Sequence, residues 1–257
     1  MSETVIREVA RNVWTFSRPF ARFGVIPFGG RSTAIKMRDG GVWLLASTPL
    51  DGETKSTLNS LGPVQFIVGA DAVHHLFLGE YKKEYPSAKV IAPEAARPRL
   101  EDKSLNFDGA WGRDPPDTKY GFEELRLGTR LLPSAQLETE HFSSHFDGFK
   151  NKDIAFFHPE SKTLIEADLL LNLPCHEQYS KVKSGGRSLG FLNVNPWSWL
   201  HPRIVWSLGV DKAAMKRDAK TVASWDFERI IPCHGDVIEG KGKDAWLNTY
   251  KFYLQDN

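Results

Sequence analysis

The chain has 257 residues, 41% of them hydrophobic and 25% charged, and these proportions exclude a disordered protein and suit a globular domain with a sizeable core. Its 33 basic and 32 acidic residues give a formal net charge of +1, so the overall charge predicts neither nucleic acid nor an anionic membrane as a partner. The sequence carries no secretory-signal pattern and no apolar run of membrane-spanning length. We therefore expect a soluble, cytoplasmic protein with one domain over residues 1–257 and a small molecule as its partner.

The N-terminal part of the sequence predicts a β-hairpin followed by a helix. Residues 5–16 and 33–37 alternate between apolar and polar side chains, as strands with one buried face do. The Arg-Asp-Gly-Gly run at 38–41 is typical of a hairpin turn before a strand over 42–46. An aspartate start signal and a Gly-Pro stop signal predict a helix over 51–61.

The next part of the sequence predicts a strand, a histidine-bearing loop, a helix and a second strand. The strand covers 64–68, and the helix covers 76–85 and ends at a proline. A short strand over 89–92 follows. Residues 97–121 are rich in charge, proline and glycine, which predicts an irregular surface excursion.

The second half of the chain predicts another hairpin. Residues 153–157 and 162–167 are strand-like runs joined by a His-Pro-Glu-Ser turn. Residues 176–206 combine aromatic and polar side chains without a clear period, which predicts a loop or lid with helical turns. The remaining predicted elements are a helix over 211–225, a strand over 227–232 and a closing helix over 243–254.

Four candidate metal ligands stand just after strand-like runs that lie far apart in the sequence. His74 and His75 follow one run, Asp168 follows a second and His234 follows a third. Imidazole nitrogens and a carboxylate oxygen are ligands that zinc prefers, and iron and manganese also accept them. The sequence therefore predicts one divalent metal ion at the edge of a folded sheet.

Each of these residues also has a purely structural interpretation. Neighbouring side chains on a regular strand point to opposite faces, so His74 and His75 both bind one ion only if they lie in an irregular loop. Asp168 can instead cap the turn that follows it. His234 can be a simple turn residue before a glycine.

Other potential donors have weaker support in the sequence. His141, His145 and Cys175 are candidates to join the site, although a lone cysteine is more often a small buried hydrophobe. His158 stands in a predicted turn and His201 precedes a proline, so both are predicted to be loop residues. The two cysteines of the chain do not make a disulfide framework, and we expect reduced thiols.

The order of elements and several motifs resemble the metallo-β-lactamase superfamily, whose fold is an αββα sandwich of two mixed β-sheets packed face to face with helices outside. The resemblance covers most of the chain. It extends to the branch catalogued as a domain of unknown function, DUF4336, through the strings HHLFL at 74–78, FHPESKTL at 157–164 and WDFERIIPCHGD at 225–236. It implies an α+β fold with a metal site built from loops at the strand ends.

The sequence departs from the superfamily's H-x-H-x-D-H motif. With His75 at the final histidine, Ala70 and Ala72 stand at the H-x-H positions and His74 at the aspartate. The Gly-His segment that carries the superfamily's middle histidine is absent near 140–145. The resemblance therefore implies that the first metal site has lost ligands, while a second site keeps the four candidates named above.

From a site that holds one metal ion through these ligands, we predict a hydrolase-like enzyme that acts on an ester, lactone, thioester or related carbonyl metabolite. The predicted catalytic residues are Asp168, as a ligand, and Asp236, as a proton relay. The candidates for an apolar pocket wall above the metal are aromatic residues of two loops: Phe20, Phe23, Trp197 and Trp199. The candidate contacts for an anionic substrate group are four basic residues: Arg31, Lys181, Lys183 and Arg187.

The lost ligands also support competing hypotheses. One is a non-catalytic protein of the same fold whose old cleft has become a structural or ligand-binding centre. Another is a metal-assisted lyase, isomerase or cyclase that acts on an apolar metabolite in a cleft that excludes water. An open coordination position facing a cavity favours an enzyme, whereas an ion sealed by four protein ligands favours a structural site.

Overall fold

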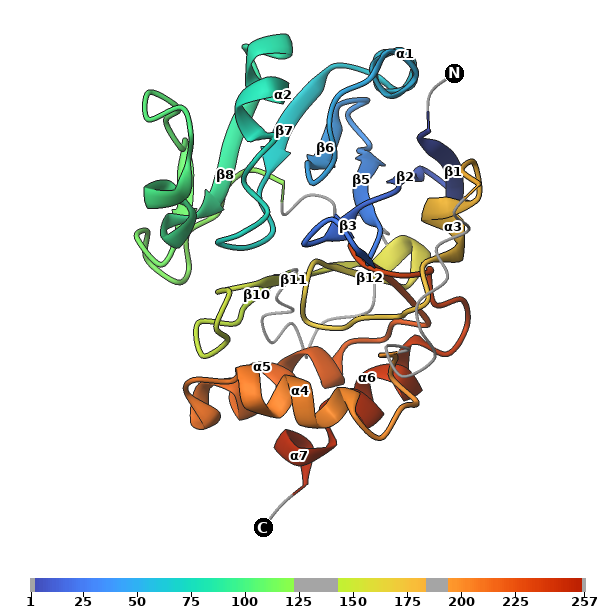
Figure 1. The fold of residues 1–257 in the computed structure, drawn as a ribbon. Helices are drawn as coiled ribbons and strands as arrows, with labels where there is room; N and C mark the ends of the chain where they lie inside the picture. Colours follow the sequence, from blue (N-terminus) through green and yellow to red (C-terminus); the bar gives the residue numbers. More distant parts are fainter. Residues whose placement is uncertain (1–2, 123–142, 184–193, 256–257) are drawn as a thin grey trace, which may run out of the picture.

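The protein is described by a computed structural model that covers residues 3–122, 143–183 and 194–255. In this part of the chain two β-sheets lie face to face, and helices cover the outer face of each sheet (Figure 1). The arrangement has four layers in the order αββα. The predicted fold class is therefore confirmed.

The larger sheet contains seven strands, and a short two-strand hairpin lies outside it. In sheet order the strands are β1 (Val5–Ala10), β2 (Val13–Arg18), β5 (Gly30–Lys36), β6 (Val42–Leu45), β7 (Val64–Val68), β8 (Lys89–Pro93) and β9 (Gly109–Trp111), and the hairpin consists of β3 (Ala21–Arg22) and β4 (Ile26–Pro27). From β1 to β6 neighbouring strands pair antiparallel, and from β6 to β9 they pair parallel. The sheet is therefore mixed, as predicted.

The smaller sheet has four strands, and its pairing explains where the site forms. Its strands in order are β10 (Ser143–His145), β11 (Ile154–His158), β12 (Thr163–Glu166) and β13 (Arg229–Pro232). β12 and β13 are parallel, with Ile165 opposite Ile231. Because the carboxyl ends of parallel strands meet at the same edge, the loops that carry Asp168 and His234 leave the sheet side by side.

Seven α-helices and two short 3-10 helices, Glu94–Arg99 and Pro159–Ser161, complete the described structure, and aspartates begin two of the α-helices. The α-helices are α1 (Gly52–Leu61), α2 (Leu78–Glu84), α3 (His176–Tyr179), α4 (His201–Leu208), α5 (Lys212–Ser224), α6 (Gly242–Thr249) and α7 (Lys251–Leu254). The side chain of Asp51 accepts from the Thr54 amide at the start of α1, and Asp211 caps α5 in the same way. None of the described helices is both long and apolar enough to cross a membrane.

Alternating side chains divide the apolar residues among three cores. On β6, Trp43 and Leu45 pack between the sheets, while Val42 and Leu44 face the helices on the outer side. Strands β7, β12 and β13 alternate in the same way. Helices α5 and α6 close the third core over the outer face of the smaller sheet (Figure 1). The continuous apolar runs of the sequence thus belong to strands that are buried on both faces.

Two segments differ from the sequence predictions, and a third has the helical turns that were predicted for it. Residues 5–16 form two strands rather than one, because the chain turns at Asn12, which has a φ of 65°. The excursion at 97–121 contributes β9 to the edge of the larger sheet. The predicted loop at 176–206 contains α3 and the first residues of α4.

His201 begins α4 and is buried, instead of lying in a loop as its position before a proline predicted. Its Nε2 accepts a hydrogen bond from the Leu171 amide at 3.1 Å, and its Nδ1 lies 3.3 Å from the Thr249 hydroxyl. An imidazole that accepts from an amide must be neutral at that nitrogen. Burial accordingly lowers the pKa of His201 to about 3.

We expect His201 to make the fold less stable as the pH falls. The unfolded chain binds a proton here near pH 6.5, whereas the folded chain does not until about pH 3, so stability is full above pH 6.5 and declines below it. The slope from this group is about 1.4 kcal/mol per pH unit. Urea unfolding of wild type and His201→Gln between pH 7 and 5 measures it. A wild-type curve parallel to that of the variant would contradict the assignment.

Candidate metal centre

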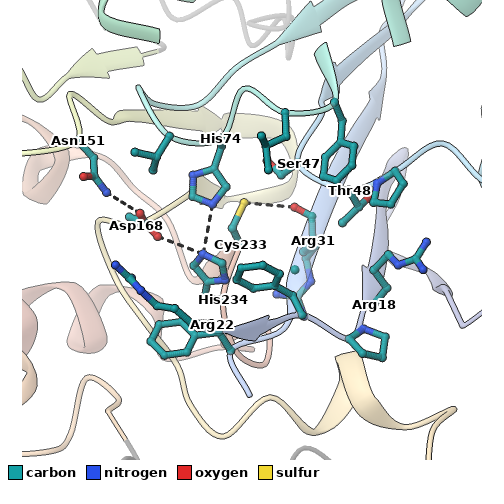
Figure 2. Close-up of a pocket in the computed structure, with 18 residues that line it drawn as sticks. Arg18, Arg22, Arg31, Ser47, Thr48, His74, Asn151, Asp168, Cys233 and His234 are labelled. Atoms are coloured by element: carbon teal, nitrogen blue, oxygen red, sulfur yellow. Dashed lines mark hydrogen bonds and ion pairs between the residues drawn. The ribbon is translucent and has the colours of Figure 1, made fainter. Parts of the chain in front are cut away.

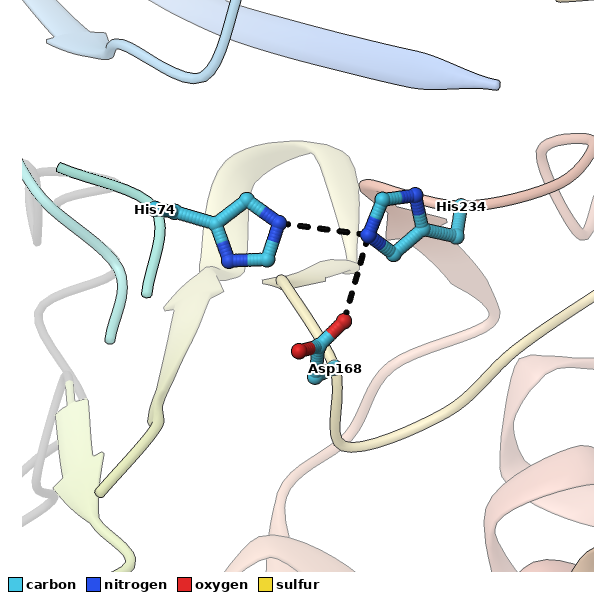
Figure 3. A group of neighbouring side chains, drawn as sticks. All are labelled: His74, Asp168 and His234. Atoms are coloured by element: carbon cyan, nitrogen blue, oxygen red, sulfur yellow. Dashed lines mark hydrogen bonds and ion pairs between the residues drawn. The ribbon is translucent and has the colours of Figure 1, made fainter. Parts of the chain in front are cut away.

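Three of the predicted ligands converge at one edge of the sandwich: His74 after β7, Asp168 after β12 and His234 after β13 (Figure 3). The Nε2 atoms of His74 and His234 are 3.2 Å apart, and Asp168 Oδ1 lies 3.2 Å from His234 Nε2. All three donor atoms lie within 4.8 Å of one another. Donor atoms bound about 2.0–2.1 Å from a tetrahedral zinc ion lie roughly 3.3 Å apart. The spacing therefore fits one divalent ion.

The outer ring nitrogens fix the orientation of both histidines. His234 Nδ1 lies 2.6 Å from the Gly29 carbonyl oxygen, which only accepts, so this nitrogen carries the proton. His74 Nδ1 lies 3.0 Å from a carboxylate oxygen of Asp71, an ion-pair contact that turns the opposite nitrogen, Nε2, toward His234. With an ion bound, both rings would be neutral, and each would turn an Nε2 lone pair toward the same point. Lone pairs this close, beside a carboxylate, are stabilised by a cation between them.

Short hydrogen bonds also hold the loops that present the donors. Asn151 Nδ2 donates to Asp168 Oδ2 at 2.6 Å, which leaves Oδ1 facing the histidines. The Asp168 amide donates to a carboxylate oxygen of Asp153 at 2.6 Å. In the other loop, Asp71 Oδ1 accepts from the amides of Val73 and His74, both at 2.7 Å. This turn makes the backbone around His74 irregular, as the predicted ligand loop requires.

The charges at the site favour a cation. Burial alone lowers the pKa of His74, but the carboxylates around it, led by Asp71 and Asp168, raise this pKa to about 10. Burial raises the pKa of Asp168, yet the charges of His74 and His234 hold it well below its usual range. Burial and neighbouring carboxylates raise the pKa of Asp153 well above its usual range. Three carboxyl groups, those of Asp71, Asp153 and Asp168, thus surround His74, and a divalent ion would offset their mutual repulsion.

The three donors open onto a cavity of about 470 Å³ (Figure 2). Its lining is mostly apolar with a few polar groups, as is usual for small-molecule sites. Besides the three donors, the lining residues are Arg18, Pro19, Phe20, Arg22, Phe28, Gly30, Arg31, Ser47, Thr48, Pro49, Val73, Leu76, Phe77, Asn151 and Cys233. The Phe20 ring stacks on the His234 ring with 6.0 Å between the ring centres, and the Phe28 ring packs edge-on against it with 5.5 Å between the centres.

Comparison with solved structures gives matches that extend over nearly the whole chain. A metallo-β-lactamase from Erythrobacter litoralis, solved with β-mercaptoethanol in its active site, has 12% identity and a TM-score of 0.60, over 98% of this chain and 97% of that one. The metallo-β-lactamase of Pontibacter korlensis has 12% identity and a TM-score of 0.56, over 98% and 100%. The mono-zinc form of the metallo-β-lactamase FIM-1 from Pseudomonas aeruginosa has 14% identity and a TM-score of 0.55, over 97% of this chain and 94% of that one.

The chain has the metallo-β-lactamase fold. No family model and no curated protein matches the sequence. At 12–14% identity the likeness establishes the fold alone.

Within this metallo-β-lactamase fold, two other predicted site residues, His75 and Asp236, lie outside the donor group. His75 is not a member of the donor group among the described residues, and its side chain lies beside Arg99, where burial lowers its pKa. Asp236 follows His234 but turns its carboxylate toward α3, where Oδ1 accepts from the Glu177 amide at 2.8 Å. The Asp236 carboxylate therefore holds α3 and does not line the cavity.

The further candidate donors also lie outside the group. His141 falls outside the described residues. His145 is on β10, where burial lowers its pKa to about 4. Cys175 is buried in an apolar cluster with Leu173 and Tyr179, and burial raises its pKa to about 12. Cys175 is therefore a small buried hydrophobe, which was the alternative to a metal ligand.

Of the four aromatic residues predicted for the pocket wall, Phe20 lines the cavity. Phe23 is 81% exposed, and Trp197 and Trp199 are 52% and 71% exposed, and none of the three lines it. The other large apolar residues of the wall are Phe28, Leu76 and Phe77. These residues come from the β4–β5 connection and from the loop before α2, and no sequence pattern predicts that these two segments lie together.

Arg31, predicted as an anion contact, has a different role. Its side chain is fully buried, and Nη1 donates to the carbonyls of Pro232 at 2.6 Å and Gly235 at 2.7 Å. These two residues flank the turn that carries His234. The Lys181 ammonium also has partners of its own: it donates to the Thr4 carbonyl and forms an ion pair with Glu53. The cavity lining also contains two other cationic residues, Arg18 and Arg22.

Proposed function

We propose that this protein is a metal-dependent hydrolase that holds one divalent ion, preferably zinc, through His74, Asp168 and His234. Its substrate is an ester, lactone, thioester or related carbonyl compound. The observation that carries the proposal is that all three donors line the cavity. Catalytic zinc sites combine three protein ligands with an open position, whereas structural sites close with four. An open cavity above three donors supports an enzyme over a sealed structural ion.

The chain's own residues prepare this chemistry in two ways. An ion held there would polarise a substrate carbonyl and lower the pKa of water. Asp71 and Asn151 hold the donors in place, a role whose loss typically weakens metal binding by about 10–100-fold. Phe20 and Phe28 cover His234 and exclude water from one side, which strengthens electrostatic interactions at the site. On the strength of the three motif strings, we also propose that the chain belongs to the DUF4336-like branch.

Metal analysis joined to a substrate screen tests the proposal. Protein purified without added metal is assayed for zinc, iron and manganese, and then for hydrolysis of a thioester, a lactone, a carboxylic ester and a phosphoester. We expect about one zinc ion per chain and hydrolysis of a carbonyl compound, lost on treatment with a chelator and regained with zinc. Protein that binds no metal after incubation with zinc, or hydrolysis indifferent to the chelator, would contradict it.

A further inference from the structure

The cavity carries an excess of positive side chains. Among the described residues its lining contains three arginines and a single carboxylate, that of Asp168. Arg31 is committed to backbone carbonyls. Arg18 lies 3.8 Å from Asp51 and 3.9 Å from Glu3, which partly neutralise it. Arg22 has no carboxylate within ion-pair distance in the described ranges, so its charge is available to a ligand.

Aromatic rings hold the Arg22 guanidinium close to the metal donors. Arg22 lies on β3, and its guanidinium carbon is 5.5 Å from the centre of the Phe23 ring and 5.8 Å from that of Phe28. Phe28 in turn packs against the His234 ring at 5.5 Å. One aromatic ring therefore separates Arg22 from a metal donor. Figure 2 shows Arg22 on the side of the pocket where Asp168 and His234 lie.

The rest of the cavity wall is largely apolar, which favours a ligand that has an apolar part. Phe20, Leu76 and Phe77 line the cavity together with two prolines, and a volume of about 470 Å³ suits a small molecule. The planar guanidinium binds a carboxylate or phosphate through two parallel hydrogen bonds. The cavity thus combines an apolar surface, one free guanidinium and a metal-donor group within a short distance.

We propose that Arg22 binds the oxyanion, a carboxylate or a phosphate, of a small acyl substrate whose apolar body lies against Phe20, Leu76 and Phe77. The carbonyl to be attacked then lies at the three metal donors, separated from the oxyanion by about the width of one aromatic ring. This assignment names the substrate class of the hydrolase proposed above and rests on that function for the carbonyl end. Binding of the anion is a property of Arg22 and is measurable by itself.

Isothermal titration calorimetry on the metal-free full chain separates the two proposals. The probes are 4-phenylbutyrate, phenyl phosphate and the uncharged 4-phenylbutanamide. We expect at least one of the anions to bind wild type more tightly than the amide, and Arg22→Gln to weaken that anion about tenfold or more. The matched control is Arg11→Gln, which removes the same charge from an exposed position in the β1–β2 turn and leaves affinity unchanged.

Each outcome decides the assignment. Tighter binding of 4-phenylbutyrate identifies a carboxylate, and tighter binding of phenyl phosphate identifies a phosphate. Arg22→Lys keeps the charge without the planar fork and is expected to lie between wild type and Arg22→Gln. Anion binding that survives Arg22→Gln, or an amide that binds as tightly as both anions, would overturn the proposal. Since no metal is present, absence of hydrolysis in the metal-loaded protein leaves this result intact.

Discussion

Replacing His74 by alanine is expected to lower the affinity for zinc by more than about 100-fold, whereas replacing His75 leaves it unchanged. Loss of a residue that only orients a ligand typically costs about 10–100-fold, so loss of a donor itself costs more. His74 contributes an Nε2 atom to the donor group, while His75 lies beside Arg99. Competition with a chromophoric chelator measures both affinities.

The neighbouring histidines make a closely matched pair. Both are partly buried, both lie in the same loop, and both lose the same atoms on truncation. Thermal unfolding of the two variants without metal checks that each keeps its fold. Equal loss of affinity in both would return His75 to the ligand set, and loss in His75→Ala alone would refute the assignment of His74.

Replacing Arg31 by methionine is expected to lower the free energy of unfolding by about 3–5 kcal/mol. Arg31 is fully buried and donates to Ser17 Oγ at 2.9 Å, to the Pro232 and Gly235 carbonyls and to Glu177 at 3.4 Å. Methionine fills similar space but leaves these acceptors without their donor. Urea unfolding measures the loss. Zinc affinity should fall as well, because the two carbonyls flank His234.

Arg7 provides the control for this variant because it binds the same carboxylate from the surface. Arg7 Nη2 lies 2.8 Å from Glu177 Oε2, and its side chain is 39% exposed. Arg7→Met removes a guanidinium in the same way but is expected to cost only about 0–1 kcal/mol, as is typical of exposed ion pairs. Similar losses in both variants would show that burial of Arg31 does not set its contribution.

Much of the fold follows from local patterns in the sequence. The Asp51 cap and the Gly-Pro stop predict α1 almost to the residue, and the strand over 64–68 matches β7. Buried strands and capped helices are recognisable because their signals lie within a few neighbouring residues. The β1–β2 turn at Asn12 was missed because both flanking strands continue the same apolar alternation.

The site was only partly predictable. His74, Asp168 and His234 were found because each follows a strand-like run, and strand ends meet at one edge of a sheet. Which of the neighbouring side chains of His74 and His75 faces the other donors was not predictable, because the turn made by Asp71 determines their orientation. Arg22 and Asn151 carry no local signal of their own and reach the cavity only through the packing of separate loops.

The sequence by itself determined the strand ends and the kinds of donor atom, since these depend on side-chain chemistry and on short-range periodicity, and its resemblance to the metallo-β-lactamase superfamily implied the four-layer class. Tertiary structure alone decided which donors meet, which cations remain free and what the cavity walls consist of. The physical reason is range: a hydrogen bond such as that between His234 and the Gly29 carbonyl joins residues 205 positions apart, and no local pattern specifies that distance.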